Sequence, residues 1–374
     1  AYEMLRSLVG SEMCIRDRQL ALVALPVILS LAITALLVMA VGADPREVFT
    51  LVWEGAFRDL RAIGQVVNFW IPLTLCSIGL IVTFTAGLWN IGVEGQMIMG
   101  AVFASWGALT LDLPTPLFVP VEILLAMLGG ALWALLVGML KTRLGVHEIF
   151  GGVALNALAS VISIYLISGP WQPPEGGSVR ATPPFPAAAL LPPMSDTFKV
   201  SLLALVIVSA AILGVWLALR GTRWGLQLKA TGKNARSALL LGVPTKRSAL
   251  SAFMVCGMLA GIAGAYRVLF TYNSLRPGVS GGIGFLGLLV VLLVANRALW
   301  APLVAFAFAA VLGGSARLKI ALQLDASLAG VLQGILVLTA LLSTGLRTRL
   351  SPSALANPVE EPAAQPVATE AARE

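Results

Sequence analysis

The sequence has 374 residues, of which 58% are hydrophobic and only 11% are charged, and its formal net charge is +7. Soluble domains carry about a quarter charged residues, so this composition excludes an ordinary soluble enzyme and indicates an integral membrane protein. The three cysteines (Cys14, Cys76 and Cys256) show no ligand spacing, and His147 is the only histidine. These counts argue against a disulfide framework and against a metal site.

Residues 1–18 (AYEMLRSLVGSEMCIRDR) are polar and resemble translated sequencing-adapter read-through, so we expect them to be a non-native segment. Beyond them, clusters of charged residues separate apolar runs of about 20 residues, which is the length that crosses a bilayer as a helix. The pattern predicts an all-α polytopic membrane protein with about ten transmembrane helices. The predicted spans are 19–41, 66–87, 95–111, 119–140, 149–168, 200–219, 248–268, 282–296, 299–315 and 326–345.

The distribution of basic residues predicts that both termini of the 19–350 transmembrane domain lie in the cytoplasm (N-in/C-in). The 220–247 segment carries seven basic residues and no acidic one, as expected for a cytoplasmic loop. The loop at 42–65 is balanced in charge and the proline-rich loop at 169–198 is near neutral, so both are predicted to lie outside. Four basic residues fall outside in this topology and count against it: Arg267, Arg276, Arg317 and Lys319. The 351–374 tail lacks periodicity and is predicted to be disordered.

The stretch GLWNIGVEGQMIMG, residues 87–100, sets polar side chains among four glycines in an apolar region. The glycines predict a break between two helices, where freed backbone groups need partners that Asn90 and Gln96 can supply. Two interpretations remain open. The break is either a capped turn at the cytoplasmic surface with Glu94 in water, or a deeper feature that faces a cavity, because intramembrane carboxylates commonly mark a translocation path.

Three further segments combine apolar residues with glycine or charge. Residues 251–266 carry small residues at a spacing that permits close helix packing in lipid. Residues 274–291 pack five glycines before an apolar run and read equally well as a re-entrant segment or an outer loop. In GVHEIFGGVALNAL, residues 145–158, the sequence predicts an interfacial helix start with Glu148 near the helix N-terminus. Asn156, two turns further on, is a better candidate for lining a polar path.

The basic 220–247 segment also contains a short predicted helix. Gly225 to Gly232 reads as a broken helix start, and Asn234 is placed to cap a helix over Ala235 to Leu241 that stops at Gly242. Its apolar residues include Ala238 and Leu239. The segment is either a positive loop that only fixes topology or a docking helix for a cytoplasmic partner. Nucleic-acid binding is disfavoured because only Trp224 accompanies the charge.

Four stretches resemble, in order and spacing, permease subunits of bacterial ABC importers for simple sugars, branched-chain amino acids and nucleosides. They are GLWNIGVEGQ, HEIFGGVALNALA, SGPW and the 223–266 stretch that begins RWGLQLKATGKNARSALL. NIGVEGQ is most similar to the nucleoside (basic-membrane-protein-linked) subgroup. The chain departs from the family after Phe285, where relatives commonly carry an acidic residue and this sequence has Leu286.

The resemblance implies a transport subunit of the bacterial cytoplasmic (inner) membrane, with no catalytic residues and no cofactor of its own. Its implied partners are a cytoplasmic ABC ATPase that binds ATP-Mg, a second permease with which it forms a heterodimer, and an external substrate-binding lipoprotein. The implied ATPase-coupling residues are Gly232, Asn234, Ala235, Ala238, Leu239 and Gly242. The expected substrate-pathway residues are Trp89, Asn90, Glu94, Gln96, Asn156 and Phe285.

The chain lacks a G-x-x-x-x-G-K-[ST] motif, so a separate ATPase would be required for ATP-driven import. The first hypothesis is therefore a permease that carries nucleosides, or alternatively simple sugars. An ion-coupled secondary transporter that uses Glu94 or Glu148 is an alternative, but no convincing inverted repeat supports it. An intramembrane enzyme would need a paired catalytic set within helices, and the spacing reveals none.

Overall fold

A computed structural model describes residues 28–40, 42–173, 181–294 and 298–321, together with positions scattered between 330 and 342. The chain divides into two compact units, residues 1–34 with 335–374 and residues 35–334. Apart from one candidate span that begins at Ile28, everything that follows concerns the second unit. The predictions for residues 1–18 and 351–374 lie outside the described residues, and the first and tenth predicted spans are described only in part.

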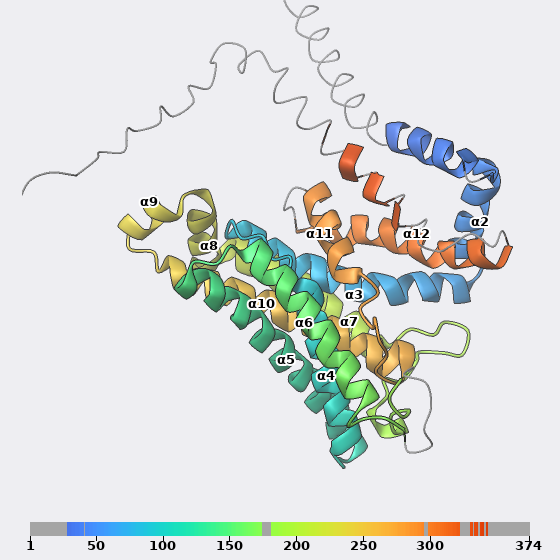
Figure 1. Cartoon of the computed structure of the whole chain (residues 1–374), viewed down its shortest axis with the longest axis horizontal. Helices are drawn as coiled ribbons and strands as arrows, with labels where there is room; N and C mark the ends of the chain where they lie inside the picture. The colour runs from blue at the N-terminus through green and yellow to red at the C-terminus, as the bar shows by residue number, and fades with distance from the viewer. Residues whose placement is uncertain are drawn as a thin grey trace, which may run out of the picture. The chain divides into compact units, whose positions relative to one another are not determined.

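The regular secondary structure in the described part of the second unit is entirely helical, as predicted. Its helices are α2 (Pro45–Phe57), α3 (Leu60–Thr85), α4 (Val93–Thr110), α5 (Thr115–Leu144), α6 (Glu148–Ser168), η1 (Ala187–Ala189), α7 (Leu202–Gly221), α8 (Arg223–Lys233), α9 (Ala235–Leu240), α10 (Thr245–Tyr266), the π-helical η2 (Arg267–Tyr272), α11 (Ile283–Val294) and α12 (Ala301–Ala321). The long helix α3 packs against α10 on one side and against α11 and α12 on the other. The helices α4, α5, α6 and α10 run side by side (Figure 1).

Glycines allow α10 to approach α4 and α5 at backbone distance. A Cβ atom on Gly257 would collide with the carbonyl of Gly130 on α5, and one on Gly100 of α4 would collide with Gly261. In lipid, small residues let helices gain dispersion contacts that the apolar solvent does not otherwise drive. The close packing predicted for residues 251–266 is therefore confirmed.

The number of membrane-crossing helices differs from the ten predicted spans. Among the described residues, five helices are long and apolar enough to cross a bilayer: Leu60–Thr85, Pro116–Leu144, Glu148–Ser168, Leu202–Gly221 and Thr245–Tyr272. A sixth span results if the helix Ile28–Ala40 and α2 together form one broken crossing. The α11 helix has only 12 residues, or about 18 Å at the helical rise, which is too short for a hydrocarbon core of about 30 Å.

Residues 42–65, predicted as an outside loop of balanced charge, are instead mostly helical, because α2 and the start of α3 occupy this region. Asp44 caps α2 by accepting from the Arg46 N–H at 2.9 Å, and Asp59 caps α3 by accepting from the Ala62 N–H at 2.8 Å. Acidic residues that balance the loop's charge in the sequence are thus helix caps. The apolar face of α2 packs on α12, where Gly55 and Gly314 are in close contact.

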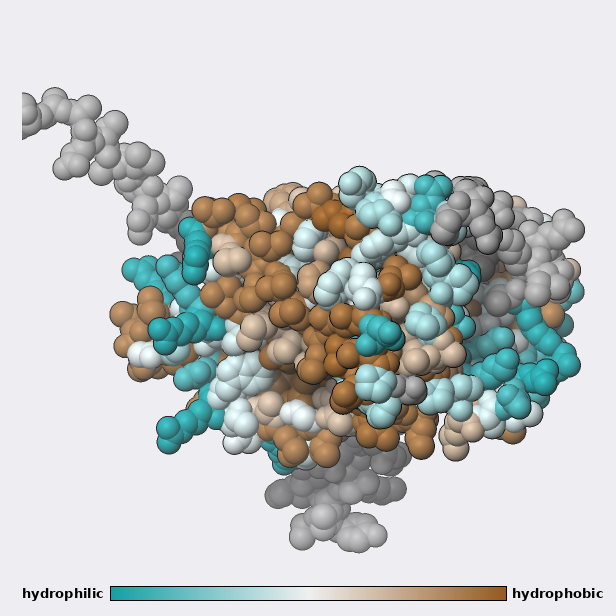
Figure 2. Space-filling model, turned by 90° about the horizontal axis from the view of Figure 1, so that it is seen from below, coloured by the Kyte–Doolittle hydropathy of each residue, from teal (hydrophilic) through white to brown (hydrophobic). Residues whose placement is uncertain are grey.

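The surface of the molecule has an apolar middle and polar ends. Figure 2 shows hydrophobic residues across the middle of the viewed face, with hydrophilic residues gathered toward the end that carries α8 and α9 and toward the opposite end. Helices on the outside contribute many exposed large apolar side chains, for example Leu124, Val161 and Leu213. Exposed apolar surface of this extent is expected for a protein that sits in a bilayer.

Candidate functional site

The segment between α3 and α4 is a non-helical break inside the bundle. The α3 helix ends at Thr85 and α4 begins at Val93, so the predicted break in the GLWNIGVEGQMIMG stretch is confirmed. Within it, the Asn90 amide donates to Cys256 Sγ at 3.1 Å. Cys256 lies about three turns into α10. At Asn90 the break is therefore buried inside the bundle.

Asn90 and Gln96 form a closed amide pair across the start of α4. Asn90 Nδ2 donates to Gln96 Oε1 at 3.1 Å, and Gln96 Nε2 donates back to Asn90 Oδ1 at 3.0 Å. Both side chains are completely buried. Because buried polar groups are costly without partners, this reciprocal pair stabilises the break. The amides face each other and Cys256, not an open space.

Glu94 joins the first turn of α4 to the beginning of α11. Its Oε1 accepts from the Gly282 N–H at 3.0 Å and its Oε2 accepts from the Gly284 N–H at 2.7 Å. The N-terminus of a helix offers free N–H groups and a positive dipole end to an anion. A Cβ on Gly284 would lie 2.5 Å from Oε2, so this approach requires glycine. The Glu94 side chain is 7% exposed, which contradicts the interpretation that places it in water.

Asn156 on α6 holds the two sides of the break together. Its Oδ1 accepts from the Gly95 N–H at 2.8 Å, and its Nδ2 donates to the Ile91 carbonyl at 2.8 Å. One side chain thereby satisfies a backbone donor at the start of α4 and a backbone acceptor in the preceding turn. Both ends of the amide are used within the protein, so in this state Asn156 positions the break.

Arg267 is a buried cation, which the sequence predicted only to lie toward the outer side of the membrane. It is 3% exposed, its Nε donates to the Val279 carbonyl at 3.2 Å, and its Nη2 donates to the Tyr272 hydroxyl. Its guanidinium also lies over the rings of Phe69 and Tyr272, 5.4 and 4.6 Å from their centroids. A signal was available in the sequence, because this arginine follows a long apolar run that ends in Tyr266, and Tyr272 comes five residues later.

Glu94 and Arg267 bind complementary backbone groups of the glycine-rich segment 278–284. The carboxylate binds N–H groups of the segment, and the guanidinium binds one of its carbonyls. Gly278, Gly281 and Gly282 all have positive φ, a conformation that glycine adopts without strain. Val279 and Ser280 are buried. Residues 274–291 therefore do not begin with a simple solvated loop.

A cavity of about 610 Å³ opens on the other face of this glycine segment. Its wall combines Trp89, Gly281, Gly282 and Phe285 with leucines of α11 and Leu312 of α12. Trp89 and Phe285 are each 45% exposed, and Trp89 packs against Phe84 with ring centroids 5.0 Å apart. Of the six pathway residues expected from the sequence, the structure brings only these two to the cavity. The other four lie in the protein behind its wall.

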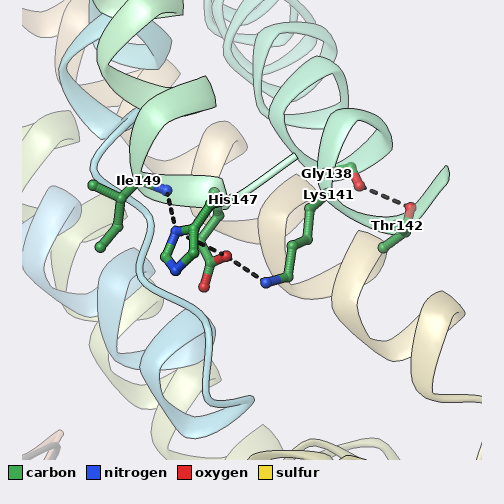
Figure 3. A network of polar contacts seen from close by, with 6 residues as sticks. Gly138, Lys141, Thr142, His147 and Ile149 are labelled. Carbon is green, nitrogen blue, oxygen red and sulfur yellow. Dashed lines mark hydrogen bonds and ion pairs between the residues drawn. The ribbon is translucent and has the colours of Figure 1, made fainter. Parts of the chain in front are cut away.

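An ion pair joins α5 to α6 where the chain turns between them (Figure 3). Lys141 Nζ lies 2.5 Å from Glu148 Oε2, and His147 Nδ1 lies 3.6 Å from the same oxygen. His147 also accepts from the Ile149 N–H at 3.4 Å and forms the N-cap of α6. The helix start predicted at Glu148 is confirmed. The carboxylate is buried while Lys141 is partly exposed.

The 220–247 segment forms two helices between α7 and α10. The region from Gly225 to Gly232, predicted as a broken start, is instead the continuous helix α8, because Thr222 caps it by accepting from the Gly225 N–H at 3.0 Å. The short helix predicted at Ala235 is confirmed as α9, and Asn234 caps it by accepting from the Ser237 N–H at 2.9 Å.

The apolar residues of α9 divide between the interior and the surface. Ala238 is buried against the protein, whereas Leu239, Leu240 and Leu241 are strongly exposed, the last two at 83% each. Gly242 ends the helix with a φ of +80°. A row of exposed leucines on a basic segment is a surface that a partner protein could cover.

The family described as branched-chain amino acid transport system / permease component matches residues 62–341. The chain belongs to this family. It is a multi-pass membrane protein and the permease component of an ABC importer, as the resemblance of its motifs implied. The matched range contains the break, the glycine segment, the cavity and the α8–α9 segment.

Individual relatives differ in the solutes that their names give. The permease is 29% identical to the guanosine ABC transporter permease protein NupP of Bacillus subtilis (strain 168), over 75% of this chain and 80% of the relative. It is 26% identical to the glucose ABC transporter permease protein TsgB13 of Haloferax volcanii, over 84% and 85%. It is 25% identical to the nucleoside ABC transporter permease protein NupB of Lactococcus lactis subsp. cremoris, over 75% and 79%. No solved structure matches this chain significantly.

Proposed function

We propose that this permease translocates nucleosides across a bacterial cytoplasmic membrane. The observation that carries the proposal is its similarity to permeases named for guanosine and for nucleosides. The cavity lined by Trp89 and Phe285 supports it, because a nucleobase presents a flat ring that stacks on aromatic side chains. Simple sugars are the second candidate, because the relative from Haloferax volcanii is named for glucose.

The proposed assembly contains a second permease, a cytoplasmic ABC ATPase and an external substrate-binding lipoprotein. Bacillus subtilis has two similar permeases named for guanosine, NupP and NupQ, which favours a heteromeric pair. In this arrangement an N-in/C-in topology places α8 and α9 on the cytoplasmic side. The proposed ATP-binding partner supplies Mg-ATP hydrolysis, and this chain supplies the path.

The exposed leucines of α9 are the proposed contact with the ATPase. Leu239, Leu240 and Leu241 project from a helix whose start is fixed by Asn234 and whose buried side rests on Ala238. Closure of the ATPase would then push on α9, and α8 would transmit the push to the end of α3, where Gly232 packs against Gly87. This makes Gly232 and Gly242 structural members of the coupling segment.

The ion-coupled alternative loses its support. It required Glu94 or Glu148 to face a proton path, and both carboxylates are bound to groups of the protein, Glu94 to backbone N–H groups and Glu148 to Lys141. Membership of an ABC importer family also supplies a different energy source. We therefore propose that transport by this permease is driven by ATP.

The solute and the energy source can be tested in one assay. The complete complex is reconstituted in proteoliposomes, and uptake of labelled guanosine and labelled glucose is followed with and without ATP. We expect ATP-dependent guanosine uptake that unlabelled nucleosides inhibit and glucose does not. Uptake of glucose alone would transfer the assignment to sugars, and uptake that persists without ATP would contradict the proposal.

The coupling surface can be tested with a matched pair of variants. Replacing Leu240 and Leu241 by serine should lower ATPase capture and uptake together, by about ten-fold, which corresponds to about 1.4 kcal/mol of binding free energy. Leu60→Ser is the control, because Leu60 is also exposed but begins α3 at the end remote from α8. Equal effects of both changes would contradict a specific role for α9.

A further inference from the structure

A second cavity lies at the end of α3 that is remote from α8. It has a volume of about 800 Å³ and is lined by the first turns of α3, by the segment 187–199 and by residues 270–273. We call it the distal pocket and define it by Arg61, Gln65, Asn68, Asp196, Lys199, Phe270 and Asn273, so its lining holds two basic side chains and one acidic one. The α3 helix has 26 residues, about 39 Å, so this pocket is a helix length away from Gly232 and α8.

One wall of the distal pocket is fixed by hydrogen bonds and ring stacking. The Tyr266 hydroxyl donates to Asn68 Oδ1 at 2.6 Å, and Asn68 Nδ2 donates to the Lys199 carbonyl at 2.9 Å. The Tyr266 ring stacks on Phe270, with centroids 5.2 Å apart and an interplanar angle of 13°. The aromatic face and the amide are therefore held in place before any ligand arrives.

Other polar groups in the pocket have no partner within the described part of the chain. The side chains of Arg61, Gln65 and Asn273 are exposed to the pocket and make no hydrogen bond or ion pair there. Asn273 is held in the left-handed conformation with φ 56°, which few side chains other than asparagine tolerate. Unused amide donors and acceptors beside a fixed aromatic ring suit a neutral solute with a ring and several hydrogen-bonding groups.

The distal pocket is also connected to the glycine segment behind the Trp89–Phe285 cavity. Both depend on the π-helical segment η2, which carries Phe270 at the pocket and Arg267 at the Val279 carbonyl. Single-turn π segments are frequent at functional sites. A solute that packs against Phe270 would therefore contact the same short segment that holds the glycine turn.

We propose that the distal pocket is a receiving subsite that binds the transported solute before it reaches the cavity at Trp89 and Phe285. The ligand is a neutral ring compound with several hydroxyl or amide groups, stacked on Phe270 and hydrogen-bonded to Gln65, Asn68 and Asn273. This inference rests on the proposed function for the identity of the solute. The position and chemistry of the subsite come from the pocket itself.

Protection of an introduced thiol tests whether the solute occupies the pocket. Gln65→Cys is made in a Cys14→Ser background, so that Cys14 does not react with the maleimide. Cys76 and Cys256 are kept because both are buried. The complete complex is placed in nanodiscs. Guanosine at about ten times its Kd should slow maleimide labelling of Cys at position 65 about ten-fold. Arg58→Cys is the control, since Arg58 is exposed, lies between α2 and α3, and is not part of the pocket lining. Its labelling should not change.

A second variant separates solute binding from protein docking. Adding Phe270→Ala to the Gln65→Cys protein should leave the labelling rate without guanosine intact and abolish protection by guanosine. Protection by the solute-free binding lipoprotein, with none by guanosine, would overturn the proposal in favour of a protein-docking surface. No protection by either would also overturn it.

Failure of the subsite and failure of the proposed function give different results. If the complex transports glucose and not guanosine, the proposed solute is wrong, and the same protection experiment is then done with glucose. If guanosine is transported normally but position 65 is never protected, the result supports the proposed function and contradicts the proposed subsite.

Discussion

Two buried carboxylates in this permease have opposite hydrogen-bonding environments. Glu94, in the first turn of α4, accepts from the N–H groups of Gly282 and Gly284 at the start of α11. Glu122, in α5, is completely buried, and neither of its oxygens has a hydrogen-bond partner among the described residues. The two side chains are almost equally shielded from solvent. The difference lies only in the groups that face them.

The contrast shows what makes a carboxylate inside a membrane protein structural. Burying an ionisable group is costly, and at Glu94 the free N–H groups and the helix dipole of α11 offset that cost. At Glu122 no such group offsets it, and its stem packs near Gly107 on α4. We therefore expect Glu94 to stabilise the fold and Glu122 to destabilise it.

The largest predicted effect comes from Glu94→Gln. The amide NH₂ would face the N–H groups of Gly282 or Gly284, so at least one buried donor loses its acceptor. We expect the free energy of unfolding to fall by about 3 kcal/mol, because hydrogen bonds to charged groups are the strong ones. The measurement is thermal unfolding of the purified complex, together with uptake.

Glu54→Gln is the control for that change. Glu54 is half exposed and pairs with Arg317 at 3.4 Å, so its loss should cost less than about 1 kcal/mol. If Glu94→Gln is as stable as Glu54→Gln but no longer transports, then the carboxylate serves the solute and not the helix start.

A smaller loss is predicted for Asn156→Ala. The change leaves the Gly95 N–H and the Ile91 carbonyl without their partner, which should cost about 2 kcal/mol. Asn156→Asp keeps the acceptor for Gly95 and loses the donor to Ile91, so it should fall between the wild type and the alanine variant. The same unfolding assay measures all three. Unchanged stability in Asn156→Ala, with a raised KM for uptake, would show that Asn156 contacts the solute instead.

The sequence predicted the helices, the break and the small-residue packing because each depends on local composition. Glycine spacing marked both the break before Val93 and the contact between Gly261 and Gly100. The cap at Asn234 was also predictable, since the side chain of a cap bonds only three residues along the chain. Local rules failed at 42–65, where Asp44 and Asp59 read as loop charges but act as helix caps.

The partners of the polar residues could not be predicted, because they come from distant parts of the chain. The sequence drew attention to Glu94, but its partners lie almost two hundred residues away at Gly282 and Gly284. The distal pocket was missed for the same reason. The pocket joins the start of α3 to residues 270–273, and no pattern within either segment indicates the other.

A gain in stability is predicted for Glu122→Met. Methionine has a similar length and fills the space without an unpartnered polar group, so the free energy of unfolding should rise by about 1 kcal/mol. Uptake should be unchanged. If the variant is more stable but transport is lost, Glu122 has a role in the transport cycle. Glu94 would then be kept for structure and Glu122 for transport.

The smallest effect is predicted at Glu148, a third buried carboxylate, whose partner is the partly exposed Lys141 and not a helix start. In Lys141→Met, water can approach the vacated side, so the loss of stability should stay below about 1 kcal/mol. Lys141→Arg should restore it, and salt should weaken the pair, since about a third of the lysine side chain is exposed. A double-mutant cycle with Glu148→Gln gives the coupling energy directly. A coupling as large as the loss in Glu94→Gln would mean that burial alone, and not the type of partner, decides how much a carboxylate contributes to the stability of this permease.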